Sequence, residues 1–394
     1  MYIRAIGTAS QWITFVSRNR WGAKISGNDN AAAEGISLSG ANYIRVEGFE
    51  VYGVGNVGSP RGSASGIDLY DMGGNAQIVG NHIHHVGRVC ANSGNTNGQV
   101  GIYVQSGKNN GNIIVENNLV HDIGRFFVGE NGCGNTTVSL DHGMYLNGST
   151  GGGGGAGNIT IRNNIFHNTH HGWGIQWYPG SLANVQVLNN TFAFCNESKS
   201  YTCIVLDASI TNSSIKNNIF YNPQGGRTIE AAGFSGSITI ADNITSGSDM
   251  DDQSGTPSGM LLSNNRLSTN AQLVNPPFDF HLLATSPAIN TGSFSSAFDF
   301  DGVARPVGGG YDIGAYEFGG SVGFIRKKSF DIYGIGRTLE STAAQSSASG
   351  IFMASDGNIF NIKWGWGGQV YLDSHARMNI LNNTFAFTNQ YPGR

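Results

Sequence analysis

Two segments rich in histidine and aromatic residues carry side chains that can move protons and stack on a ligand. The first is Asp141-His142-Gly143-Met144-Tyr145, and the second spans residues 170–178. Histidine exchanges protons near neutral pH, tyrosine can act as an acid, and aromatic rings stack on flat ligands. Because their polar and aromatic residues fall at matching places, we expect the two segments to be equivalent turns of one repeating unit.

The repeating unit reads Gly-Ile-x-Leu, then a loop, then Asn-Ile-x-Ile-x-Asn-Asn-x-Ile-x-His. Its six copies begin at Gly35, Gly66, Gly101, Gly143, Gly174 and Cys203. Alternation of period two between Gly or Asn-Asn turns predicts about three short strands per copy. One copy cannot bury its apolar face, but stacked copies can. The sequence therefore predicts an all-β fold, a right-handed parallel β-helix built as a single-stranded solenoid of three-strand rungs.

With these repeats, residues 1–270 resemble the pectate-lyase-like β-helix superfamily. Residues 286–317, with Asp-Phe-Asp-Gly-Val-Ala-Arg-Pro and Gly-Gly-Tyr-Asp-Ile-Gly-Ala-Tyr-Glu, resemble a C-terminal end module of the choice-of-anchor type found in secreted bacterial β-helix proteins. We expect residues 271–318 to cap the last apolar rung. Its aspartates Asp299, Asp301 and Asp312 are expected to form turns, with a calcium ion as the alternative.

Residues 319–394 are expected to form a degenerate partial repeat of residues 113–196, because Gly-Trp-Gly and Leu-Asn-Asn-Thr-Phe-Ala-Phe recur in both. A degenerate duplication, the start of a second solenoid and a gene-assembly artefact all remain open for this segment.

Composition narrows the class of protein. The chain has 59 glycines, 39% hydrophobic and 12% charged residues, and a formal charge of −4. Its one basic cluster is at residues 326–328, so nucleic acid is not expected as a partner. No apolar run reaches membrane-spanning length, so no membrane anchor is expected. Met1 is followed directly by a strand-like segment, which suggests a truncated or mature start.

The four cysteines are Cys90, Cys133, Cys195 and Cys203, and none forms a Cys-x-x-Cys pair. The first two lie in two insertions and the last two flank one short loop, which favours two disulfides over four buried thiols. We therefore expect a monomeric protein that is secreted or at the cell surface, of bacterial origin.

Alternation within a rung predicts which side chains face outward. If Ile67, Ile102, Met144 and Ile175 fill the core, then residues beside them line one exposed sheet face. Aromatic and amide groups on such a face describe a carbohydrate-binding groove, although exposed strands also favour tyrosine without any ligand. The predicted substrate-binding residues are Asp68, Tyr70, Tyr103, Gln105, Asn147, His171, Trp173, Gln176, Trp177 and Tyr178.

A third ladder follows the Asn-Asn turn and contains His84, His121 and His167. Insertions at residues 88–100 and 125–142 leave from this corner, and long loops on one side of a repetitive scaffold are where sites are built. The residues expected to meet there, and predicted to be catalytic, are His142, Arg125, Tyr145, Arg88 and Asp141.

This set suits β-elimination from a uronic-acid polymer. Arg88 and Arg125 would neutralise the substrate carboxylate, His142 would take the α-proton, and Tyr145 or Tyr103 would protonate the leaving oxygen. The leading prediction is thus a polysaccharide lyase. The arginines can equally bind loop carbonyls, and the stacked histidines can be a polar ladder without a function.

Two other functions stay open. Hydrolysis needs two carboxylates about 5–9.5 Å apart, and the candidates are Asp68, Asp71, Asp122 and Asp141. The second alternative is a non-catalytic carbohydrate-binding or adhesin solenoid. No cofactor and no metal ligands are predicted, because histidines from successive rungs form a row and not a tetrahedron, although calcium remains possible.

Overall fold

The computed structural model describes residues 1–320 except 56–62, 73, 91–97, 107–110, 135–139, 150–155, 196–201, 224–226, 252–254 and 294–295. The chain divides into two units, Met1–Ser321 and Val322–Arg394. The second unit contains nearly all of the predicted partial repeat and lies outside the described residues.

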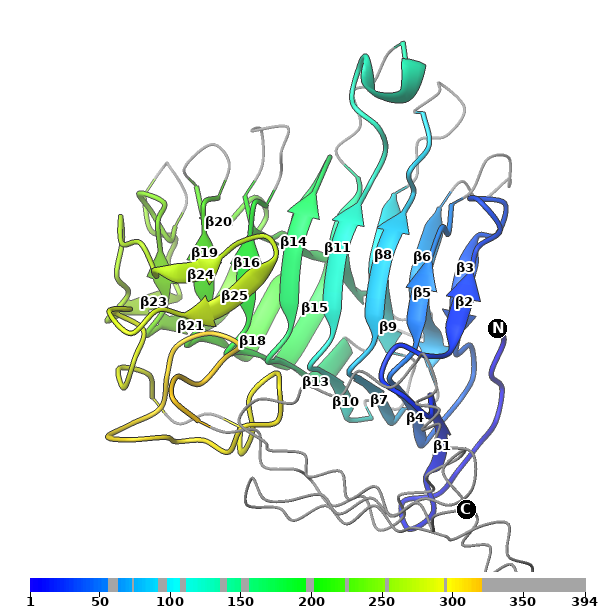
Figure 1. Ribbon diagram of the computed structural model, residues 1–394, viewed down its shortest axis with the longest axis horizontal. Coiled ribbons are helices and arrows are strands. Elements are labelled where there is room, and N and C mark those ends of the chain that lie inside the picture. Colours follow the sequence, from blue (N-terminus) through cyan, green and yellow to red (C-terminus); the bar gives the residue numbers. More distant parts are fainter. Residues whose placement is uncertain are drawn as a thin grey trace, which may run out of the picture. The chain divides into compact units, whose positions relative to one another are not determined.

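Three parallel sheets run along the first unit, and we number them 1 to 3 (Figure 1). Sheet 1 contains β3 (Glu34–Ser37), β6 (Ala64–Met72), β9 (Gln99–Ser106), β12 (His142–Gly148), the first part of β15 (Ile175–Leu188), β17 (Ile204–Leu206) and β20 (Ile229–Glu230). Sheet 2 contains β1 (Ile13–Val16), β4 (Ile44–Glu47), β7 (Ala76–Val79), β10 (Ile113–Glu116), β13 (Ala156–Arg162), the second part of β15, β18 (Ser209–Lys216), β21 (Ser235–Ala241) and β23 (Met260–Ser263).

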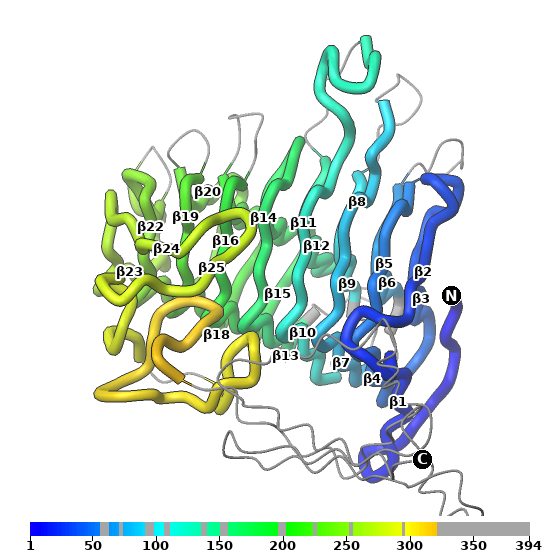
Figure 2. The backbone as a smooth tube through the Cα atoms, in the orientation of Figure 1, coloured from blue at the N-terminus to red at the C-terminus, as the bar shows by residue number. Residues whose placement is uncertain are grey.

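Sheet 3 contains β2 (Lys24–Ser26), β5 (Glu50–Tyr52), β8 (His82–Val86), β11 (Leu119–Ile123), β14 (Ile165–Thr169), β16 (Thr191–Ala193), β19 (Ile219–Tyr221) and β22 (Ile244–Thr245). One 3-10 turn, η1 (Glu130–Gly132), lies in an insertion. Each rung takes one strand from each sheet, as in β9, β10 and β11, and the backbone winds from rung to rung (Figure 2). The predicted right-handed parallel β-helix is confirmed.

The core is one apolar column inside the three sheets. Strand register places Ile67 beside Ile102 and Met144 beside both Ile102 and Ile175, and all of them are fully buried. Burying each such side chain contributes about 1.5–3 kcal/mol. The rings of Phe166 and Phe192 continue the column with centroids 5.2 Å apart. The inward positions predicted from alternation are therefore the ones that the fold buries.

The two residues of each Asn-Asn turn have different duties. The first asparagine is left-handed, with φ of 57° at Asn117 and 52° at Asn163, a conformation that asparagine tolerates. The second is buried and hydrogen-bonds to its counterpart one rung away. Asn118 Nδ2 donates to Asn164 Oδ1 at 2.9 Å, and Asn164 Nδ2 donates to Asn190 Oδ1 at 3.0 Å. The ladder satisfies polar groups at a corner that water does not reach.

The end module packs along the outer face of sheet 3, and not only on the last rung. Its hairpin of β24 (Leu273–Asn275) and β25 (Asp279–Leu282) shares an apolar cluster with Ile165, Ala193 and Ile219. These outward positions are apolar in the later rungs, so they need a cover. The first asparagines hold the module, since Asn117 Nδ2 donates to the carbonyls of Asp299 and Phe300.

The aspartates of the module form turns, as expected. Asp299 accepts hydrogen bonds from the backbone N–H groups of Asp301, Val303 and Glu317. Asp312 accepts from the N–H groups of Asn290 and Phe318. Carboxylates saturated by backbone donors have few lone pairs left for a calcium ion.

Both predicted disulfides are confirmed, Cys90–Cys133 and Cys195–Cys203. The first joins the insertion at residues 88–100 to the insertion at residues 125–142, and the second closes one loop between sheet 3 and sheet 1. No helix within the described residues is long and apolar enough to span a membrane.

Candidate functional site

The outer face of sheet 1 carries a row of aromatic and polar side chains. Strand pairing sets Asp68 beside Tyr103, Tyr103 beside Tyr145, and Tyr145 beside Gln176. The rings of Tyr103 and Tyr145 are stacked, with centroids 5.4 Å apart and planes 19° from parallel. Both tyrosines are partly exposed, and Tyr70 and Tyr178 beside them are exposed. The predicted outward ladder is therefore present. We call its four tyrosines, Tyr70, Tyr103, Tyr145 and Tyr178, the aromatic strip.

Amides hold this strip in place. Asn147 Nδ2 donates to the Tyr103 hydroxyl at 2.8 Å, and that hydroxyl donates to Gln105 Oε1 at 3.3 Å. Burial raises the pKa of Tyr103 to about 12 and also raises the pKa of Tyr145. Both phenols therefore stay protonated at neutral pH and can donate hydrogen bonds or a proton, but neither is a base.

Trp177 is a correction to the predicted groove. Its side chain is fully buried and belongs to the core cluster. It pairs with Leu146 and Leu206, which also point inward, so alternation places its ring inside the solenoid. Trp177 therefore fills the core and cannot stack on a sugar. Trp173 is partly exposed and stays at the edge of the strip.

The predicted catalytic residues come together, but most of them lie beneath the surface. Arg125 and Asp141 are fully buried, with Arg125 Nη1 at 3.5 Å from Asp141 Oδ1. The two Asp141 oxygens also accept from the N–H groups of Gln99 and Arg125, at 3.0 and 2.8 Å. The Arg125–Asp141 pair therefore links the two ends of the insertion at residues 125–142. Asp141 also links this insertion to strand β9 through Gln99.

His142 is buried as well, with 1% of its surface exposed. Its ring lies 5.4 Å from Trp173 and 5.7 Å from Tyr145, and its Nδ1 accepts the Trp173 N–H at 3.3 Å. Burial, and secondly the charge of Arg125, lower the pKa of His142 to about 3. It is a neutral imidazole without access to solvent, so its role as a base stays a prediction that requires the corner to open.

Arg88 and His171 complete this corner. Arg88 Nη1 donates to the carbonyls of Gly124 and Arg125, at 3.1 and 3.2 Å, and its Nη2 pairs with Glu130. His171 is buried against Phe127, with ring centroids 4.4 Å apart. Loop carbonyls and carboxylates thus engage Arg88, the non-catalytic alternative that the sequence left open.

Buried histidines make the fold sensitive to acid. The pKa is lowered to about 3 in both His142 and His167, mainly by burial. Below the ordinary pKa of about 6.5 the unfolded chain takes up protons that the folded chain refuses. We expect the free energy of unfolding to keep its highest value above pH 6.5. Below that pH it should fall by up to about 1.4 kcal/mol per pH unit for each histidine, down to about pH 3.

Urea unfolding at a series of pH values checks this expectation. His142→Asn should reduce the slope between pH 6 and 4. His281→Asn serves as the control, because the pKa of His281 is raised, to about 9, by Asp301 and Asp279. A free energy of unfolding that stays constant from pH 6.5 to 4 would contradict the prediction.

The carboxylates proposed for hydrolysis do not share one face. Asp68 lies on sheet 1, and Asp141 is buried. Asp122 lies on β11 of sheet 3, where its Oδ2 forms a hydrogen bond with His121 Nδ1. Two other carboxylates lie at or beside sheet 1. Glu230 pairs with Val205 of β17 on the neighbouring rung, and Asp207 directly follows β17. The signal for Glu230 was Thr228-Ile229-Glu230, one rung beyond the last copy, which begins at Cys203.

Sheet 3 carries the histidine ladder. Register aligns His84, His121 and His167, as predicted, with the rings of His121 and His167 stacked 4.5 Å apart. Two residues outside the predicted ladder join it: His82, on the same strand as His84, and Glu50, which pairs with His82. Within the described part of the chain, Glu50, His82 and His84 are the group whose spacing suits a metal ion.

Fold and surface together define a right-handed parallel β-helix with an aromatic strip on one sheet. No family model and no curated protein matches the chain. Among solved structures, it is similar to pectate lyase Pel9A, at 14% identity over 80% of this chain and 82% of that chain, with a TM-score of 0.44. A glycoside hydrolase matches at 11% identity over 68% of this chain and 54% of that chain, with a TM-score of 0.29. The GH136 lacto-N-biosidase from Eubacterium ramulus matches at 10% identity over 68% of this chain and 59% of that chain, with a TM-score of 0.25.

Proposed function

We propose that this protein is carbohydrate-active and binds a polysaccharide along the outer face of sheet 1. The observation that carries the proposal is the stacked pair Tyr103 and Tyr145, which are both partly exposed on the outer face of a parallel sheet. Sugar rings present apolar C–H faces that pack on aromatic rings, while their hydroxyls need amide and carboxylate partners. Gln105 and Asn147 supply amides within the same two rows, whereas the predicted Gln176 is buried.

The charge of this face bears on the kind of glycan. The strands of sheet 1 include Asp68 and Glu230 but contain no lysine or arginine. Elimination from a uronic acid, the reaction expected from the sequence, needs a cation to neutralise the substrate carboxylate. Arg88 and Arg125 are engaged inside the corner. The face therefore favours a neutral glycan, and an acidic one would need a bridging cation such as calcium.

Hydrolysis is the cleavage reaction that the face supports best. Glycoside hydrolysis uses two carboxyl groups about 5–9.5 Å apart. Glu230 pairs with Val205 of β17 and Asp207 directly follows that strand, so the two carboxylates come from neighbouring rungs and are the candidate pair. Trp173 Nε1 donates to Glu230 Oε2 at 3.4 Å and orients that carboxyl group. Elimination by Tyr145 and an opened His142 is the second candidate.

One panel of substrates separates these possibilities. The protein is incubated with neutral glycans and with pectin, alginate and glycosaminoglycans, each with calcium and with a chelator. New reducing ends without ultraviolet absorbance support hydrolysis, and absorbance from unsaturated uronates supports elimination. Binding in affinity electrophoresis without cleavage supports a non-catalytic carbohydrate-binding protein. No cleavage and no binding on any glycan contradicts the proposal.

Loss of one ring should weaken glycan binding. Tyr145→Ala removes half of the stacked pair, and a contact of about 1–2 kcal/mol corresponds to about 5–30-fold in Kd. Affinity electrophoresis or calorimetry with the best-bound glycan measures this change. Tyr221→Ala is the matched control, because Tyr221 lies on sheet 3. Equal affinities for the two variants would remove the aromatic strip from the binding site.

The two disulfides favour an oxidising compartment, so we propose that the protein acts outside the cytoplasm.

A further inference from the structure

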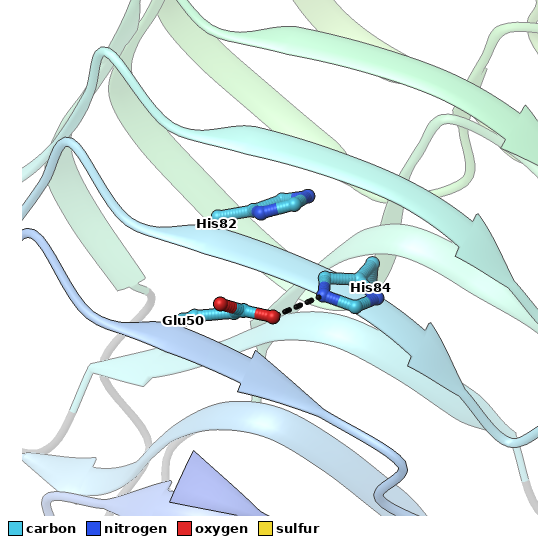
Figure 3. A group of neighbouring side chains, drawn as sticks. All are labelled: Glu50, His82 and His84. Atoms are coloured by element: carbon cyan, nitrogen blue, oxygen red, sulfur yellow. Dashed lines mark hydrogen bonds and ion pairs between the residues drawn. The ribbon is translucent and has the colours of Figure 1, made fainter. Parts of the chain in front are cut away.

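A second group of side chains that can bind a ligand, Glu50, His82 and His84, lies on sheet 3, on a different face from the aromatic strip. Glu50 of β5 pairs with His82 of β8, and His84 lies two residues further along β8, so all three side chains point outward from the same sheet face. Figure 3 shows the carboxylate of Glu50 and the two imidazoles turned toward one another. The proposed glycan site uses none of these groups.

The spacing of this group suits a metal ion. One ligand atom from each residue lies within 4.8 Å of the others, and Glu50 Oε1 is 3.3 Å from His84 Nε2. An ion with bonds of about 2.0–2.2 Å holds neighbouring ligand atoms roughly 3–4 Å apart. The Glu50 and His84 atoms already have this separation, and the His82 ligand atom lies within 4.8 Å of both.

Surrounding residues hold the ligands in position. Asp122 Oδ2 lies 2.6 Å from His121 Nδ1, and His121 Nε2 lies 2.7 Å from His82 Nε2. Because the carboxylate takes the His121 Nδ1–H, His121 Nε2 accepts from His82 Nε2–H, and this leaves a lone pair on His82 Nδ1. An imidazole binds a metal through such a lone pair while its other nitrogen is hydrogen-bonded.

Aromatic rings pack the two histidines from the sides. Tyr52 stacks on His84 with centroids 5.5 Å apart, and Trp21 lies 4.8 Å from His82. The side chains of Glu50 and His84 are 15% and 14% exposed, so an ion can reach them but most water is excluded. Packing of this kind lowers the entropy lost when a ligand set closes on an ion.

We propose that Glu50, His82 and His84 bind a divalent transition-metal ion, with Zn²⁺ as the best fit. Two imidazole nitrogens and one carboxylate oxygen are donors that suit zinc, nickel or cobalt, whereas calcium and magnesium take oxygen ligands. Three protein ligands leave the fourth position of a tetrahedral zinc ion open to water. The set is not a single row, because Glu50 and His82 are partners on neighbouring rungs whereas His84 lies two residues further along the strand of His82.

Lys24 offers an independent signature. Its Nζ lies 2.7 Å from Glu50 Oε2, the oxygen that does not face His84, so the ion pair leaves Oε1 for the metal. The ammonium group repels a divalent cation that is bound to the other oxygen of the same carboxylate. Lys24→Met should therefore tighten zinc binding several-fold, while loss of a surface lysine elsewhere should leave it unchanged.

The test uses the full chain after treatment with a chelator. Isothermal titration with Zn²⁺ should give one site per chain, and Co²⁺ should give the intense visible absorption of a tetrahedral ion. His84→Asn and the pair His82→Asn with Glu50→Gln should weaken Kd by about 100-fold or more. His281→Asn, an exposed histidine of the end module, is the matched control and should leave Kd unchanged.

Folding of each variant is checked by its melting temperature without metal, and zinc should raise that temperature in the wild type but not in the ligand variants. Absence of a zinc heat in the wild type overturns the proposal. Equal Kd values for the wild type and His84→Asn overturn it too, since they assign the ion to other histidines. Neither result bears on glycan binding at sheet 1, which the Tyr145→Ala measurement tests separately.

Discussion

Arg125→Met is expected to lower the free energy of unfolding by about 3–5 kcal/mol, because it leaves the Asp141 carboxylate buried without its cation. Both side chains are fully buried, and Asp141 also accepts the N–H groups of Gln99 and Arg125. Burial raises the pKa of Asp141, and Arg125 is the largest influence opposing that rise. Without Arg125, the carboxyl group must be protonated or solvated, and either change loosens the corner.

The control is Arg162→Met. Arg162 pairs with Glu116, with 2.6 Å between Nη2 and Oε2, but both side chains are partly exposed, at 33% and 19%. Exposed ion pairs contribute about 0–1 kcal/mol, so this variant should unfold almost like the wild type. Urea unfolding followed by circular dichroism gives both values.

This comparison separates a structural from a catalytic Arg125. If the arginine faced a glycan, Arg125→Met would keep the free energy of unfolding and lose only binding or turnover. A variant as stable as Arg162→Met would therefore contradict the buried arrangement and restore Arg125 to the predicted active site.

Asn164→Leu is the second substitution with a large expected effect, about 3–6 kcal/mol of unfolding free energy. Asn164 Oδ1 accepts from the backbone N–H and the side chain of Asn118, and its Nδ2 donates to Val115 O and Asn190 Oδ1. Leucine has a similar size but leaves these buried partners unsatisfied. Each unsatisfied buried group costs about 1–3 kcal/mol, and partial relaxation reduces the sum.

Because each rung contacts only its neighbours, the weakened interface should also lower cooperativity. Thermal unfolding of Asn164→Leu should broaden or divide into two transitions. Asn112→Leu is the control, since Asn112 is exposed on the surface and its change should stay within about 0.5 kcal/mol. A single sharp transition at the wild-type temperature would contradict a structural role for the ladder.

The end module explains why the two ends of sheet 3 differ. In the early rungs the outward positions are Glu50 and His82, and in the later rungs the equivalent positions are Ile165, Thr191 and Ile219. The module covers the apolar part, where Phe280 lies 5.2 Å from His167. The histidine cluster therefore sits beside the covered area and remains partly open.

The sequence by itself determined the repeating rung. Period-two alternation predicted that Ile102 and Met144 point inward and that Tyr103 and Tyr145 lie in one outward row, and the register bears this out. It also predicted the row of His84, His121 and His167. These features are local, because identical units stack at about 4.8 Å and so bring equivalent positions together.

Only the tertiary structure decided which outward positions reach solvent. Asp141 and His142 close an insertion and were predicted to be catalytic, yet they are buried where two disulfide-linked insertions meet the solenoid. Alternation from Ile175 in fact places Trp177 inward, so the inclusion of Trp177 in the predicted groove was wrong on the pattern itself. Insertions and the end module carry no periodicity, and the surface they cover depends on contacts between residues far apart in the chain. For the same reason, the grouping of Glu50 with His82 and His84 emerges only when neighbouring rungs are placed side by side.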